Sequence, residues 1–210
     1  MAAYIVALTG ASGAVYGLRL IDELLKRGDD VDMIISPAGF LILNHELGLV
    51  LKDLDVVEAV KGFIRKNRRG GRRGVRGKSE GALNYYPADL LTAPLASGSS
   101  LRRKMVLCPC SMGTLSRIAS GASGNLIERA ADCVLKERGD LILVPRETPL
   151  NSIHLENMLK LSRAGAVILP AMPGFYSGPS KIGDLVDFIV GKILDVLGIE
   201  NNLYMRWNKG

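Results

Sequence analysis

The chain has 210 residues, of which 48% are hydrophobic, so it can bury one good core and is most economically a single domain spanning 1–210. No apolar run approaches the roughly 18 residues of a membrane span, and MAAYIVALTG enters a predicted strand without a basic region or a cleavage site, so we expect a cytoplasmic protein. Three cysteines cannot all pair and lack CxxC spacing, so we expect Cys108, Cys110 and Cys133 to be small buried residues.

The net charge of +6 comes from one segment. Nine basic residues and no acid lie between Lys61 and Lys78, and the remaining 18 basic and 21 acidic residues sum to −3. Because its repeated glycines disfavour a helix, we predict that 61–81 is a basic, Gly/Arg-rich insertion loop. Nucleic acid is therefore not the expected partner, and contact with RNA or polyphosphate remains the alternative.

Apolar runs of strand length alternate with patterns of helical period. The predicted strands are Tyr4 to Leu8, Val31 to Ile35, Met105 to Leu107, the LILV run before Pro145, and Ala166 to Leu169. Helical spacing appears in Leu18, Leu20, Ile21 and Leu24, and again in Ile189, Ile193 and Leu197. This alternation predicts an α/β fold, with a doubly wound, mostly parallel sheet and helices on both faces. Five strand ends then share one edge, where ligands bind in such sheets.

A glycine-rich turn follows the first predicted strand. Gly10, Gly13 and Gly17 precede a helix whose free N–H groups suit a phosphate or the edge of an aromatic ring. The spacing is GxxGxxxG rather than GxGxxG, and Ser36 stands where a dinucleotide fold often has an acid, which favours a mononucleotide over NAD. Glycines that merely permit close helix packing are the alternative.

Two further patterns suggest a phosphate pocket. On a helix predicted from about Leu126 to Arg138, Arg129 and Lys136 flank Cys133 on one face. The LILV strand ends in Arg146 and Glu147, which makes this pair a site candidate. Solvated surface charge and a structural Arg146–Glu147 ion pair are the respective alternatives.

Several motifs together resemble one family, the UbiX-like flavin prenyltransferases. They are GASGAVYGLRL, ASGSS, CPCSMGTLS, NLIERAADCVLKER, LVPRETPL, HLENMLKLS, AVILPAMPGFY and the closing RW, and they cover nearly all of the chain except 61–81. The resemblance implies a Rossmann-like or flavodoxin-like subunit that moves a dimethylallyl group from dimethylallyl monophosphate to N5 and C6 of reduced FMN, without a metal. The prenylated FMN would serve a UbiD-like decarboxylase. The resemblance also implies a homododecamer in which neighbouring subunits complete each site.

The same resemblance implies roles for individual residues. The FMN contacts would be Gly10, Ala11, Ser12, Ser36, Ser111, Met112, Gly113, Thr114 and Arg129. The prenyl-phosphate pocket would comprise Ser97, Lys136, Arg146, Glu147, Tyr176 and Lys192, and the site would be lined by Trp207 in the C-terminal segment 198–210. Of these, the catalytic residues would be Glu147, Lys136, Trp207 and Ser12.

One departure and two alternatives remain. Leu91 stands where many relatives carry an aromatic residue, which bears on the rate or the prenyl chain accepted. An FMN-dependent cysteine decarboxylase of the same fold is one alternative, favoured by His45, although the matching region reads Pro170-Ala171-Met172-Pro173-Gly174 and lacks the Asn-Met motif of those enzymes. A flavin carrier without catalysis is the other.

Overall fold

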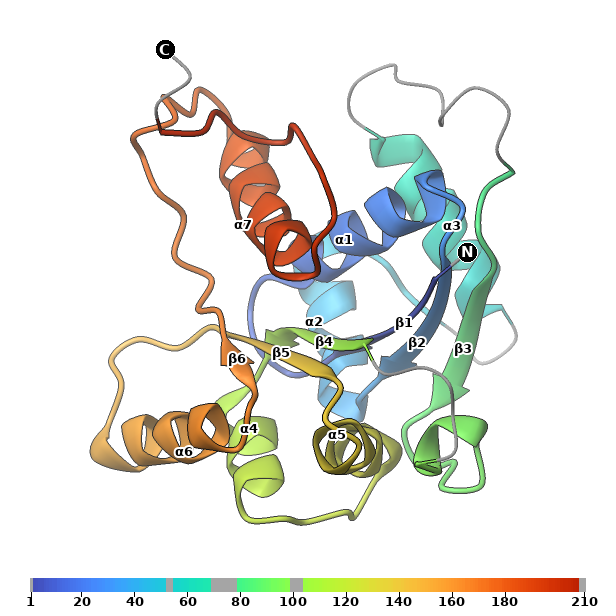
Figure 1. Ribbon diagram of the computed structural model, residues 1–210. Helices are drawn as coiled ribbons and strands as arrows, with labels where there is room; N and C mark the ends of the chain where they lie inside the picture. The colour runs from blue at the N-terminus through green and yellow to red at the C-terminus, as the bar shows by residue number, and fades with distance from the viewer. Residues whose placement is uncertain (1, 52–54, 69–78, 99–103, 208–210) are drawn as a thin grey trace.

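A single parallel sheet forms the centre of the molecule (Figure 1). The computed structural model describes residues 2–51, 55–68, 79–98 and 104–207. Within them, six strands pair in the order β3-β2-β1-β4-β5-β6. The strands are β1 (Ala3–Leu8), β2 (Asp30–Ile35), β3 (Leu83–Pro87), β4 (Lys104–Cys110), β5 (Asp140–Pro145) and β6 (Val167–Ile168). All five pairings are parallel, which confirms the predicted α/β fold and makes the sheet parallel throughout.

Helices cover both faces of this sheet, so the central strands are apolar on both sides. Val6 and Leu8 of β1 join one hydrophobic core, whereas Ile5 and Ala7 join the other. The first core is closed by α1 (Ala14–Lys26), α2 (Pro37–Leu47), α3 (Val56–Asn67) and α7 (Ile182–Val196). The second is closed by α4 (Met112–Ala119), α5 (Leu126–Lys136), α6 (Ser152–Arg163) and the short helix η1 (Pro94–Ala96). Among the described residues, no helix combines the length and apolar character needed to cross a membrane.

The sequence analysis missed β3, which is an edge strand. Its sequence, LNYYP, contains one buried residue, Leu83, because an edge strand is covered less completely than the strands inside the sheet. A continuous apolar run is therefore not required there, and the run-based pattern found five strands instead of six.

The predicted insertion loop begins as a helix. Helix α3 continues through Lys61 to Asn67, so the loop prediction was wrong for 61–67. The glycines on which it rested begin at Gly70, and 69–78 lie outside the described residues.

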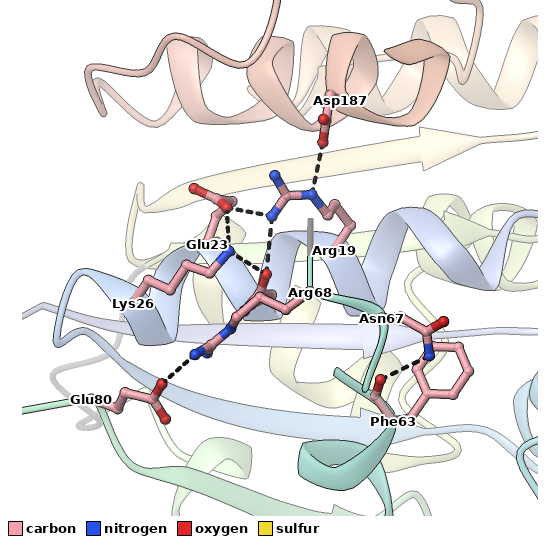
Figure 2. Close-up of polar contacts among 9 residues, drawn as sticks. Arg19, Glu23, Lys26, Phe63, Asn67, Arg68, Glu80 and Asp187 are labelled. Atoms are coloured by element: carbon pink, nitrogen blue, oxygen red, sulfur yellow. Dashed lines mark hydrogen bonds and ion pairs between the residues drawn. The ribbon is translucent and has the colours of Figure 1, made fainter. Parts of the chain in front are cut away.

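A charge network joins α1 to α7 and to both ends of this segment (Figure 2). The buried carboxylate of Asp22 accepts from Arg19 at 3.1 Å, from Lys26 at 2.5 Å and from Arg68 at 2.9 Å. Arg68 also pairs with Glu80 at 2.8 Å, and Arg19 with Asp187 of α7 at 2.7 Å. Arg68 is thus engaged in ion pairs within the chain and does not stand free for a partner.

Candidate active site

The strand order creates a crevice between β1 and β4. From β1 the chain moves outward to β3 and then returns to the other side of β1, so the segments after β1 and β4 leave in opposite directions. Thr9–Gly13 follow β1, Ser36 follows β2, and Ser111 follows β4. These segments place eight of the nine predicted FMN contacts at one edge of three adjacent strands, namely Gly10, Ala11, Ser12, Ser36, Ser111, Met112, Gly113 and Thr114.

The three glycines of the first turn have different structural roles. Gly13 is the N-cap of α1 and has a left-handed backbone, with φ of 106°, that side chains disfavour. A Cβ on Gly10 would lie 2.5 Å from the Cβ of Ala38, and one on Gly17 would lie 2.2 Å from the carbonyl oxygen of Cys108. Gly10 and Gly17 therefore permit close packing, as the structural alternative held, whereas Gly13 shapes the turn itself.

A carboxylate already binds the N-terminus of α1. Glu46 of α2 accepts from the backbone N–H of Gly13 at 3.0 and 3.1 Å and from that of Ala14 at 3.1 Å. These N–H groups stand at the positive end of the helix, where anions are favoured. The carboxylate of Glu46 marks this turn as an anion-binding position.

The sequence analysis missed Glu46. It carries no spacing motif, and its role depends on α2 lying beside the turn between β1 and α1. An acid one position after His45 was the only local signal.

Thr9 fastens the two strand ends that border the crevice. Its hydroxyl accepts from the backbone N–H of Ser111 at 2.7 Å and donates to the carbonyl of Pro109 at 2.9 Å, and its residue is only 1% exposed. The hydroxyl of Ser111 in turn accepts from Thr114 N–H at 3.3 Å and caps α4. Ser36 caps α2 by accepting from Gly39 N–H at 3.0 Å. The N-termini of α1, α2 and α4 thus open on the same edge of the sheet.

The predicted stripe on α5 lies against η1. Arg129 Nε donates to the carbonyl of Ala96 at 3.0 Å, and Cys133 Sγ lies 3.3 Å from the same oxygen. Farther along the stripe, Lys136 Nζ would lie 2.4 Å from a Cβ on Gly98, next to Ser97. Lys136 also pairs with Glu137 at 3.0 Å, which raises the pKa of the lysine.

Arg146 and Glu147 lie just past the end of β5. Arg146 is exposed, and within the described parts of the chain no hydrogen bond or ion pair engages its guanidinium. Glu147 accepts from the backbone N–H of Thr148 at 3.1 Å. The described residues contain no Arg146–Glu147 ion pair, so the structural alternative for this pair is not observed, and the guanidinium remains available to a ligand.

A third group forms around the C-terminal segment. The rings of Tyr176 and Trp207 meet edge to face with centroids 5.3 Å apart, and Tyr176 meets Phe188 of α7 at 5.7 Å. The ammonium of Lys192 lies 5.7 Å from the Phe188 ring and 5.1 Å from the Tyr204 ring. Tyr176, Lys192 and Trp207 therefore belong to one cluster of aromatic rings and cations.

One subunit does not gather all of the predicted phosphate ligands. Helix α5, with Lys136, packs on one face of the sheet, and α7, with Lys192, packs on the other (Figure 1). Lys136 precedes β5 and Arg146 follows it. Because a strand of this length spans about 20 Å, the two residues lie beyond opposite ends of β5. The three cations Lys136, Arg146 and Lys192 thus face separate regions of the isolated subunit.

The cysteines are structural. All three are free and buried, as expected. Burial raises the pKa of Cys108 far above its ordinary value and that of Cys110 to about 12. Their thiols are therefore protonated at neutral pH and are not nucleophiles.

Comparison with known proteins agrees with this geometry. A family model described as Flavoprotein matches residues 2–194. A flavin prenyltransferase UbiX of Halalkalibacterium halodurans is 51% identical over 206 residues, which cover 98% of this chain and 93% of that protein. The chain belongs to the flavoprotein family and, within it, to the UbiX flavin prenyltransferases.

Two solved structures of this family have closely similar folds. AnUbiX in complex with FMN and dimethylallyl pyrophosphate superimposes with a TM-score of 0.83 at 34% identity, over 100% of this chain and 98% of that one. A dodecameric FMN-dependent UbiX-like decarboxylase from Escherichia coli gives 0.81 at 34% identity, over 98% and 99% of the two chains.

The crevice between β1 and β4 is electrostatically suited to an anion. The N-termini of α1, α2 and α4 supply positive potential there, and the N–H groups of Gly13 and Ala14 are already engaged by the carboxylate of Glu46. Leu91, at the position of the missing aromatic residue, follows β3 and is 47% exposed. The ring of Tyr85, on β3, packs against Phe40 with centroids 6.2 Å apart.

We predict that Thr9→Val weakens both the fold and the crevice. Valine keeps the shape but leaves the N–H of Ser111 without its acceptor, while the carbonyl of Pro109 keeps its second hydrogen bond, from the backbone N–H of Thr9 at 3.2 Å, so the free energy of unfolding should fall by about 1–3 kcal/mol. Urea unfolding followed by circular dichroism measures the stability, and flavin fluorescence measures FMN affinity, which should fall as well. Thr9→Ser is the control because it keeps the hydroxyl. If valine costs no more than serine in either measurement, Thr9 does not hold the strand ends.

Proposed function

We propose that this chain is a flavin prenyltransferase that transfers a dimethylallyl group from dimethylallyl monophosphate to reduced FMN. The observation that carries the proposal is the anion-binding crevice between β1 and β4, in a chain half identical to flavin prenyltransferases. Reduced FMN supplies the nucleophilic N5 and C6 atoms that accept the prenyl carbons. The product, prenylated FMN, would be passed to a UbiD-like decarboxylase.

The crevice residues would hold the flavin. Gly10, Ala11 and Ser12 would contact the ring or its phosphate, with Gly10 and Ser12 as the N–H donors, since the N–H of Ala11 donates to the carbonyl of Thr9 at 2.9 Å. The hydroxyls of Ser36 and Ser111, which cap α2 and α4, would lie at the edge of the crevice. Met112, Gly113 and Thr114, in the first turn of α4, would add further contacts, and Arg129 would contribute a cation from α5.

The remaining polar residues would bind the substrate phosphate. A monophosphate leaves slowly unless cations and donors already surround its developing charge, and Lys136, Arg146, Tyr176 and Lys192 would provide them without a metal ion. Ser97, beside Lys136, would contact the same group. On the opposite side, the flavin and the ring of Trp207 would stabilise the allyl cation through their π faces.

Glu147 would act as the proton carrier. It lies beside Arg146, just past the end of β5. Its carboxylate would move a proton between the flavin nitrogen and the departing phosphate. Ser12 would orient the ring for this step from the glycine turn.

Lys136, Arg146 and Lys192 require neighbouring subunits in order to meet. We therefore propose a homododecamer, like the assembly named for the relative from Escherichia coli. Large exposed apolar side chains support contacts between subunits. The exposed fraction is 80% for Ile182, 73% for Phe175 and 62% for Ile153. A cytoplasmic location stays a prediction from the sequence.

A cysteine decarboxylase is the weaker candidate. His45 favours it, but the segment 170–174 lacks the Asn-Met motif, and the half-identical relative is a flavin prenyltransferase. A passive carrier would leave Arg146, exposed and without a partner among the described residues, unused.

The direct test is to incubate the protein with FMN, a reductant and dimethylallyl monophosphate, and to analyse the flavin by mass spectrometry. We expect a flavin heavier by one prenyl unit. Release of carbon dioxide from a cysteinyl peptide would instead indicate the decarboxylase, and an unchanged flavin with no other product would indicate the carrier.

We predict that Glu147→Gln slows turnover about 10²- to 10⁴-fold, the usual contribution of a general acid–base group, while FMN binding is retained. Single-turnover absorbance of the flavin measures the rate, and flavin fluorescence measures binding. Glu156→Gln, on the exposed side of α6, is the control. A wild-type rate in Glu147→Gln would remove this residue from the chemistry.

We further predict that two inactive variants complement each other. Lys136→Ala and Glu147→Gln subunits, co-expressed with two different tags and purified as mixed assemblies, should recover roughly a quarter of the wild-type rate, because half of the subunits supply each residue independently. Assemblies of a single variant are the controls. No recovery would mean that both residues of each site come from the same subunit.

A further inference from the structure

The C-terminal segment 199–207 folds back along α7 and is held there by one carboxylate. After α7 the chain turns at Gly198, whose φ is 74°, and returns along the helix (Figure 1). Both oxygens of Asp195 are engaged by this segment. One accepts from Arg206 at 2.6 Å and from Asn201 at 2.9 Å, and the other accepts from Tyr204 at 2.6 Å and from Arg206 at 3.2 Å.

These contacts keep Asp195 charged. Burial alone would raise the pKa of its carboxyl group, but the hydrogen bonds from Arg206 and Tyr204 lower it below the ordinary value. A carboxylate that accepts a bidentate pair of hydrogen bonds from an arginine and a short hydrogen bond from a phenol is a strong and directional anchor.

Packing around Tyr204 reinforces this anchor. Its ring lies directly on Gly191 of α7, where a Cβ would come within 2.5 Å of the ring. Lys192 of α7 and Arg206 of the C-terminal segment lie 5.1 and 5.5 Å from the centroid of the Tyr204 ring. The centroid of the Phe188 ring lies 5.0 Å from it. Two cations therefore lie within 6 Å of the ring centroid, and the negative charge of Asp195 offsets theirs.

The anchor is connected to the residues assigned to the substrate. Contact with the Tyr204 hydroxyl raises the pKa of Lys192, so its ammonium is held by the same ring that Asp195 orients. Trp207 is adjacent to Arg206 in the chain and meets Tyr176 at 5.3 Å. The segment thus carries one proposed aromatic wall and contacts one proposed phosphate ligand.

We infer that Asp195 is a positioning residue, which fixes the C-terminal segment on α7 and thereby places Lys192, Tyr176 and Trp207 for the phosphate and the prenyl group. The inference about substrate rests on the proposed function. The inference about the segment rests only on the contacts of Asp195 and Gly191. Asp195 itself touches no proposed substrate atom.

The chain supplies its own reporter for this segment, because Trp207 is its only tryptophan. In Asp195→Asn, an amide nitrogen would oppose the donors of Arg206 or Tyr204, and the charge that balances Lys192 and Arg206 would be lost. Trp207 is already 71% exposed, so its mobility rather than its accessibility is the measurement, and we expect its fluorescence anisotropy to fall toward the value in urea. Far-UV circular dichroism should be unchanged, since α7 ends at Val196 independently of the segment.

Steady-state kinetics then test whether the segment positions the residues assigned to the substrate or is only attached to α7. Asp195→Asn should raise KM for dimethylallyl monophosphate about tenfold or more, in line with the loss of hydrogen bonds to a charged group, while FMN affinity is unchanged. Glu200→Gln, which removes an exposed carboxylate of the same segment, is the matched control and should behave as wild type.

A second variant displaces the segment without changing any charge. Gly191→Ala should push Tyr204 off α7 and give the same changes in the anisotropy of Trp207 and in KM, although alanine favours the helix itself. Gly62→Ala in α3, where a Cβ would meet nothing within 4 Å, is its control.

The outcomes are distinct. An unchanged anisotropy of Trp207 in both Asp195→Asn and Gly191→Ala overturns the inference. A lower anisotropy with an unchanged KM also overturns it, because the segment would then position nothing, and so does a raised KM with an unchanged anisotropy. If the wild-type protein forms no prenylated flavin, the proposed function fails, and the fluorescence of the two variants still decides whether Asp195 holds the segment.

Discussion

The reversal of strand order between β1 and β4 is the constraint on which the site depends. It opens a crevice only if the two strand ends stay together while the segments after them diverge. The buried hydroxyl of Thr9 makes that link, because it joins the backbone of Ser111 and Pro109 across the two ends. A parallel sheet has no turn between neighbouring strands to do this, since its crossovers lie on the two faces.

Electrostatics then decide what the crevice can hold. Three helices, α1, α2 and α4, begin at the same edge, and each leaves N–H groups without partners inside its own helix. Glu46 satisfies those of α1, which shows that the turn favours a negative group. The phosphate of a mononucleotide is an anion as well, so the donors that it would use are those of the turn and of α2 and α4 that Glu46 does not occupy.

The same layered architecture limits a single subunit. Its two helical layers lie on opposite faces, so Lys136 on α5 and Lys192 on α7 cannot reach a common ligand within one chain. The symmetric assembly that we propose would resolve this, because one subunit's α5 layer would face another's β5 end or C-terminal segment. On this view Asp195 matters to more than its own subunit, since the segment it holds forms one wall of a shared site.

The sequence alone determined the layers and the chemistry of the site edge. Continuous apolar runs mark strands buried on both faces, and the residues that end them, from Gly10 to Arg146, fall at one edge because parallel strands share a direction. Runs of this kind could not reveal β3, whose outer position leaves it half covered, nor the helix through Asn67 before the glycines of the basic segment. Only the tertiary structure decided that Glu46 reaches the first turn, that Thr9 joins two strands 100 residues apart, and that Asp195 holds the end of the chain. Each is a contact between elements, and no local pattern records which elements will meet.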